Sequence, residues 1–80
     1  MAHVVFLSHL LAVTDGEAEL DVPARNVREL LAALEQRFPD AGEELRRSAI
    51  AIDGLICHDA FLETLGPDSE VYFMPQIAGG

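Results

Sequence analysis

Hydrophobic residues follow a β-strand pattern at the start of the chain. Residues 4–11, VVFLSHLL, form a run rich in β-branched and apolar residues, and a turn signal, TDG, follows at residues 14–16. Residues 17–22, EAELDV, then alternate carboxylates with apolar side chains, so one face of this segment is polar. The two segments predict an antiparallel hairpin at the edge of a sheet.

The apolar spacing changes to that of a helix after Asn26. The apolar stripe consists of Val27, Leu30, Leu31, Leu34 and Phe38. Asn26 is a favourable N-cap with Glu29 three residues later, and Pro39 ends the helix. We interpret the stripe as part of the core rather than as a groove for a partner, because the hairpin needs a cover.

A second hairpin follows a polar connector. Residues 40–47 are polar and predict a connector with a helical turn around Leu45. The segments AIAI, at 49–52, and LIC, at 55–57, flank Asp53-Gly54, a dipeptide typical of a type I′ turn.

The last strand is EVYFM, at residues 70–74, and Pro75 ends it. The loop before it, residues 58–69, is expected to contain a short turn that buries Phe61 and Leu65.

This order of elements predicts one α+β domain with one helix on one face of a mixed sheet. The first and last strands are apolar on both faces, which places them in the centre of the sheet. No second helix is predicted to cover the opposite face, so we expect an exposed apolar patch there, and such patches often mark partner sites. The alternative is that the loop at 58–69 folds over part of this face.

Composition excludes several classes of protein. The 80 residues contain one cysteine, Cys57, so an intrachain disulfide or an iron–sulfur cluster is not expected. The net charge of −9 disfavours nucleic-acid binding and favours a partner with a basic face. No apolar run approaches a membrane span of about 18 residues, and the N-terminus lacks the basic start of a signal peptide, so a cytoplasmic protein is expected.

Candidate catalytic groups are few. Cys57 and His58 are adjacent, but neighbours on a strand point to opposite faces, so Cys57 is interpreted as an apolar filler rather than a nucleophile. The three histidines, His3, His9 and His58, lack the spacing of a metal site, so no metal is expected. Enzymatic activity by this chain alone is not expected. The five Lys/Arg side chains are all arginine, so lysine is absent. One interpretation is a genome-wide bias from lysine to arginine. The alternative is that a chain with an activated acyl end benefits from having no nucleophilic side-chain amines.

The chain resembles the β-grasp (ubiquitin-like) sulfur carriers of the MoaD/ThiS type. The features that carry this resemblance are the order of elements, the Asp53-Gly54 turn, the strand and its exit over Glu70–Pro75, and the end over Ile77–Gly80. The resemblance is greatest to the small subunit of molybdopterin synthase, although Gln76 stands where that subunit has a second proline. It implies a β-grasp domain over residues 1–75, with one helix on a mixed four- to five-stranded sheet whose parallel first and last strands are central. A flexible tail over residues 76–80 would follow.

The resemblance also implies a function for Gly80. An E1-like adenylating enzyme would use ATP to activate the Gly80 carboxylate, and a sulfur donor such as a cysteine desulfurase or rhodanese would convert it to a thiocarboxylate. The large catalytic subunit of a molybdopterin synthase would then be a stable partner. No cofactor is expected on this chain itself. The alternatives are a sulfur carrier for thiamine or amino-acid biosynthesis, a ubiquitin-like protein modifier, and a plain interaction module.

The tail suits delivery of an acyl end into a partner. The six residues from Pro75 to Gly80 can extend about 20 Å, and three of them have almost no side-chain bulk. We expect Ile77 to anchor the tail at the partner's entrance; the alternative is that it folds back on its own sheet. The residues expected to contact a partner are Phe73, Met74, Pro75, Ile77, Ala78 and Gly79.

Overall fold

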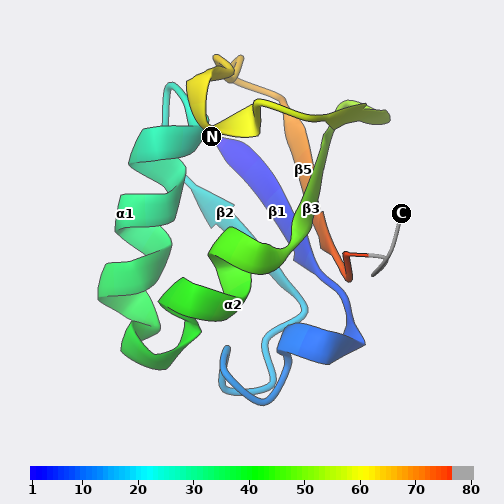
Figure 1. Ribbon diagram of the computed structural model, residues 1–80. Coiled ribbons are helices and arrows are strands. Elements are labelled where there is room, and N and C mark those ends of the chain that lie inside the picture. Colours follow the sequence, from blue (N-terminus) through cyan, green and yellow to red (C-terminus); the bar gives the residue numbers. More distant parts are fainter. Residues whose placement is uncertain (77–80) are drawn as a thin grey trace.

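The computed structural model describes residues 1–76 as a single sheet with helices on one face (Figure 1). The strands are β1 (Ala2–Phe6), β2 (Glu19–Val22), β3 (Ala49–Ile52), β4 (Leu55–Cys57) and β5 (Glu70–Met74). The α-helices are α1 (Val27–Arg37) and α2 (Gly42–Arg47), and the short 3-10 turns are η1 (Ser8–Leu10), η2 (Pro39–Ala41) and η3 (Ala60–Leu62). Among residues 1–76, no helix is long and apolar enough to cross a membrane.

The five strands lie in the order β2-β1-β5-β3-β4. β1 and β5 pair in parallel, and the other three pairings are antiparallel. β5 is therefore the middle strand, with β1 on one side and β3 on the other. The predictions of an edge hairpin and of parallel central first and last strands are both confirmed.

α1 begins and ends where the sequence predicts. The Asn26 side chain accepts a hydrogen bond of 2.8 Å from the Glu29 N–H, which caps the helix. The Glu29 carboxylate accepts from the Arg25 N–H instead of the Asn26 N–H, so the reciprocal half of the capping box is shifted by one residue.

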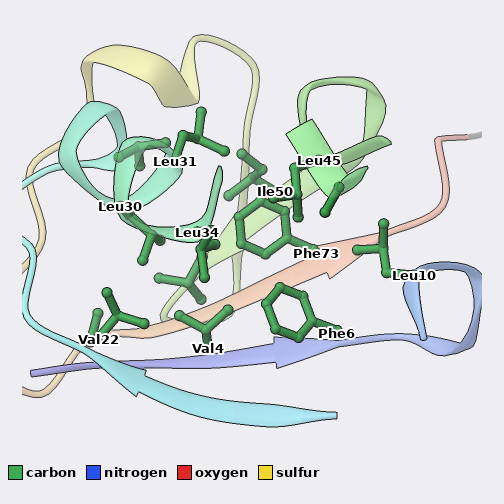
Figure 2. Close-up of a cluster of buried hydrophobic side chains, with 14 of the residues drawn as sticks. Val4, Phe6, Leu10, Val22, Leu30, Leu31, Leu34, Leu45, Ile50 and Phe73 are labelled. Atoms are coloured by element: carbon green, nitrogen blue, oxygen red, sulfur yellow. The ribbon is translucent and has the colours of Figure 1, made fainter. Parts of the chain in front are cut away.

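The core lies between the sheet and the two α-helices. Val4 and Phe6 from β1, Val71 and Phe73 from β5, and Ile50 from β3 point toward α1. Figure 2 shows the two phenylalanine rings beside these aliphatic side chains, and the ring centroids of Phe6 and Phe73 are 5.8 Å apart. The apolar stripe of α1 is thus part of the core, as predicted.

The first strand is shorter than the predicted segment of 4–11. β1 ends at Phe6, and the chain turns through η1, where the Leu10 N–H donates to the Leu7 carbonyl. The turn brings Leu10 into the core, where it is fully buried (Figure 2). A continuous apolar run does not show where a strand ends, because both the strand and the turn bury apolar residues here.

A second helix replaces the predicted single turn around Leu45. α2 buries Leu45, and Ala41, four residues earlier, is buried beside it. Glu43 and Glu44 lie in its first turn and Arg46 and Arg47 in its last, an order that complements the helix dipole. The sheet is therefore covered by two helices instead of one.

The second hairpin matches its prediction, but the loop after it does so only in part. Asp53 and Gly54 both have positive φ, 51° and 86°, as a type I′ turn requires. Leu65 is buried as expected. Phe61 is not, because its ring lies at the surface beneath the Arg28 guanidinium, which is 5.3 Å from the ring centroid.

Candidate functional site: the exit of β5 and the open face of the sheet

We use the name open face for the side of the sheet that points away from α1. The central row of side chains on this face crosses four strands and consists of Val5, Tyr72, Ala51 and Ile56. Val5 pairs with Tyr72, Tyr72 with Ala51, and Ala51 with Ile56. The 3-10 turn in the loop at 58–69 packs against α1, on the helix side of the sheet. Tyr72 is therefore 38% exposed, in the middle of the row.

β5 directs the chain out of the middle of the sheet. Its last pair is Met74 with Ala49 of β3, and on the other side the Leu7 N–H donates to the Phe73 carbonyl at 3.3 Å. Pro75 and Gln76 follow and are exposed. The start of the tail is thus held between β1 and β3, the two strands that flank β5.

The structure places only part of the predicted contact surface. Met74 is half-buried on the open face, and Pro75 is exposed. The inclusion of Phe73 is corrected, because its side chain is fully buried in the core. Tyr72, one residue earlier, occupies the exposed position, and the strict alternation of β5 was the signal for it. The predicted site residues Ile77, Ala78, Gly79 and Gly80 lie outside the described residues.

Basic side chains lie next to this exit. α2 ends with Arg46 and Arg47, only two residues before Ala49, the partner of Met74. Arg46 pairs with Glu35 at 2.8 Å, and it borders a hollow of about 500 Å³ together with Gln76. Because carboxylates of α1 and α2 pair with both arginines, these side chains do not give the exit a net positive charge.

A histidine–serine contact fixes the turn η1 to the start of β3. The Ser48 hydroxyl donates to the Glu44 carbonyl at 2.8 Å, so the Ser48 oxygen accepts from Nε2 of His9, at 3.0 Å. Nδ1 of His9 is buried and has no hydrogen-bond partner within the described part of the chain. This contact holds the end of β1 and the start of β3 on either side of the β5 exit.

Cys57 and His58 both border the hollow beside Gln76, because β4 ends at Cys57 and the chain turns there. The Cys57 thiol is half-buried against the core and contacts the Leu55 carbonyl at 3.5 Å. No hydrogen bond joins Cys57 to His58 among residues 1–76, and over the same range no three histidine, cysteine or carboxylate side chains are grouped to hold a metal ion.

His3 lies on the open face between two carboxylates of β2. Its Nδ1 is 2.9 Å from Asp21 Oδ1, and its Nε2 is 2.8 Å from Glu19 Oε1. The hydrogen bond to Asp21, followed by that to Glu19, raises the pKa of His3 above its ordinary value of 6.5. One side of the open face therefore carries a carboxylate cluster that protonated His3 partly neutralises.

Replacement of His3 by glutamine should reduce stability in mildly acidic solution. Since the pKa of His3 is raised in the folded state, the contribution of the protonated imidazole is fully present below its unfolded pKa and is lost as the pH rises through the folded pKa. We expect the thermal midpoints of wild type and His3→Gln to differ more at about pH 5.5 than at about pH 8.5. An equal difference at both values would contradict the charged pair.

The sequence matches the ThiS family model over residues 4–80, which is nearly the whole chain. The chain belongs to the ThiS family. Its membership confirms the resemblance to the β-grasp sulfur carriers. No curated protein sequence matches the chain significantly.

Three solved structures share the fold of this ThiS-family chain. A chain of the Amycolatopsis orientalis BexX/CysO complex superposes with a TM-score of 0.86 at 17% identity, and the match covers 100% of both chains. SAMP1 from Haloferax volcanii gives 0.73 at 18% identity, covering 99% of this chain and 98% of SAMP1. A chain of the complex of subunits 1 and 2 of the Helicobacter pylori molybdopterin-converting factor gives 0.71 at 23% identity, covering 99% and 97%.

Proposed function

We propose that this ThiS-family chain carries sulfur as a thiocarboxylate on Gly80. The observation that carries the proposal is the family match, which continues through residue 80 and so includes the Ala78-Gly79-Gly80 end. The geometry of β5 supports it, because a tail that starts from the middle strand of a packed sheet is presented from a fixed point.

The proposed chemistry begins with activation of a carboxylate, because this anion is a poor electrophile. The Gly80 carboxylate attacks the α-phosphorus of ATP, pyrophosphate leaves, and an acyl-adenylate forms. The terminal sulfur of a persulfide then attacks the acyl carbon and AMP leaves. A second thiol reduces the acyl disulfide, which yields the thiocarboxylate and a disulfide on the donor side. The thiocarboxylate sulfur is the nucleophile in the later transfer.

The adenylating and sulfur-donating groups belong to partner proteins in this proposal, namely an E1-like enzyme and a cysteine desulfurase or rhodanese. The carrier provides the acyl end and a docking surface. Two of the structural neighbours come from complexes of two proteins, the BexX/CysO complex and the complex of molybdopterin-converting factor subunits 1 and 2. These complexes support docking of a second protein on the carrier fold.

Intact-mass measurement after incubation with an activating enzyme, ATP and a sulfur donor tests the function. We expect the mass change of one oxygen replaced by sulfur, confined to the C-terminal peptide. Higher-mass conjugates joined through lysines of other proteins would instead indicate a protein modifier. No change in mass with an enzyme that activates another ThiS-family carrier under the same conditions would contradict both functions.

For the sulfur recipient, we propose the large catalytic subunit of a molybdopterin synthase, because the sequence resembles the small subunit of that enzyme. A stable complex with this subunit, together with sulfur transfer to a molybdopterin precursor, is the expected result. Transfer only in a reconstituted thiamine or amino-acid pathway would assign the carrier to that pathway and contradict our choice.

Tyr72→Asp should weaken binding of the activating enzyme by at least about tenfold, because it places a charge in the centre of the apolar row on the open face. Isothermal titration calorimetry measures the affinity. Ala32→Asp, on the exposed side of α1, is the matched control and should bind as wild type does. Equal losses in the two variants would contradict docking through the open face.

A further inference from the structure

Charge is distributed unevenly over the open face. β5 alternates between the two faces of the sheet, and Val71 and Phe73 are buried on the helix side. The open face therefore carries Glu70 at the start of the strand, Tyr72 in its middle and Met74 at its end. Glu70 and Met74 are about 13 Å apart along the strand. The tail thus leaves from the apolar end of this face, and a charged end lies opposite the exit.

Three exposed carboxylates gather at the charged end. His3 pairs with Asp21 on one side and with Glu70 on the other, so these side chains form one row beside the apolar row. The His3 imidazole also contacts the Glu19 carboxylate at 2.8 Å, which places Glu19 on the same face. We call Glu19, Asp21 and Glu70 the acidic end of the open face. In Figure 1, β1 and β5 run from this end of the sheet toward the end at which β5 exits.

The cations of the chain leave the acidic end largely unneutralised. Arg28 lies over the Phe61 ring, and the N-terminal ammonium donates to the Pro67 carbonyl. The other four arginines pair with carboxylates elsewhere: Arg25 with Glu29, Arg37 with Glu17, Arg46 with Glu35, and Arg47 with Glu43 and Glu44. Within residues 1–76, His3 is therefore the only cationic side chain in contact with the acidic end, and it can offset one of the three charges.

We propose that the open face binds a partner surface with an apolar centre and with arginine or lysine side chains on the side away from the tail. The apolar centre would cover Tyr72, and the basic side chains would lie opposite the acidic end. This inference rests on the proposed function, because it takes the activating enzyme as the partner. It adds the charge of the enzyme's docking surface and the position of that charge relative to the tail.

The two ends of the open face would together orient the bound enzyme. Apolar contact is non-directional, so the apolar row alone does not fix how the enzyme is rotated on the sheet. An attraction confined to the acidic end, about 13 Å from the exit, favours the one rotation that brings the tail to the enzyme's site. Opposite charges also accelerate the encounter of the two proteins.

The same charges argue against a second copy of this chain as the occupant. Each copy has a net charge of −9, so two copies repel each other. Four of the five arginines that a second copy could offer are already paired with its own carboxylates. A basic surface on a different protein replaces this repulsion with attraction.

Two double variants with the same net charge test the position of the basic surface. Asp21→Lys with Glu70→Lys reverses two charges of the acidic end. Asp40→Lys with Glu63→Lys is the control, because Asp40 lies in η2 and Glu63 follows η3, both exposed and away from the open face. The probe is an enzyme that activates another ThiS-family carrier, and stopped-flow fluorescence measures the rate constant of association.

At low salt the acidic-end variant should associate at least about tenfold more slowly than wild type, and the control variant less than about threefold more slowly. The difference between the two should largely disappear at about 1 M salt, which screens the charges. Because Asp21→Lys also removes a hydrogen bond to His3, Glu70→Lys alone is a second variant. The Glu70 side chain makes no hydrogen bond or ion pair within residues 1–76, so we expect an unchanged fold and at least about threefold slower association.

Equal slowing by the two double variants, or no slowing by either, would overturn the inference. Thiocarboxylate formation by wild type in that case would leave the proposed function intact. Wild type that binds the enzyme but gains no sulfur, with binding lost only in the acidic-end variant, would support the docking surface and contradict the proposed function. A dimer of the free chain that Tyr72→Asp abolishes, measured by analytical ultracentrifugation, would also overturn the inference, because the open face would then serve self-association.

Discussion

Deletion of Gly80 is expected to abolish sulfur transfer without loss of the fold. In the proposed mechanism the carboxylate must reach the α-phosphate of ATP in the partner's site, and a chain one residue shorter places it about 3.5 Å too far back. Transfer should fall to the level of a reaction without carrier. The measurement is thiocarboxylate formation by intact mass, followed by sulfur transfer to the recipient.

Two controls separate delivery from docking. The truncated chain should keep its affinity for the activating enzyme to within a few-fold, because the open face and the β5 exit are unchanged. Tyr72→Asp should instead lose affinity for that enzyme while it keeps the Gly80 carboxylate. Gly80→Ala keeps the length and the carboxylate and adds one methyl group, so we expect partial activity. Full transfer by the truncated chain would rule out the tail mechanism.

Phe73→Ala is expected to destabilise the domain by about 3–5 kcal/mol, the usual cost of removing a buried aromatic side chain. Phe73 is fully buried in the middle strand and contacts Phe6 across the parallel pair. A domain of this size has a free energy of unfolding of about 4–12 kcal/mol, so the variant should be partly or largely unfolded. Urea unfolding followed by circular dichroism measures the change.

Tyr72→Ala is the matched control for this substitution. It removes an aromatic side chain from the same strand, but from the open face, where Tyr72 is partly exposed. We expect less than half of the loss found for Phe73→Ala. Similar losses for the two variants would contradict the assignment of the two faces of β5.

Local chemistry determines the elements that could be predicted from the sequence. Asn26 can cap only a helix that follows it, and Asp53-Gly54 adopts the positive φ values that a two-residue hairpin needs. The apolar pattern of β5 also placed it in the centre. Each of these signals lies within a few residues of the element that it specifies, so the local sequence determines the type of that element largely without tertiary contacts.

The remaining features depend on contacts between distant residues. Leu10 continues an apolar run but lies in a turn that packs into the core, and α2 forms where Ala41 and Leu45 are buried in the same core. Phe73 was predicted to face a partner because it lies close to the tail, yet the register of β5 with β1 and β3 places it in the core. The apolar row of the open face crosses four strands, and only the pairing of β3 with β4 follows from a local turn; no local pattern specifies the pairing of β5 with β1 and with β3.

The position of β5 also has a mechanical consequence. A partner that draws the tail into its own site pulls along the axis of this strand. Because β5 is bonded to β1 on one side and to β3 on the other, such a pull shears both ladders at once, and their hydrogen bonds share the load instead of opening one after another. The carrier can therefore be held under tension by its tail while its domain stays folded.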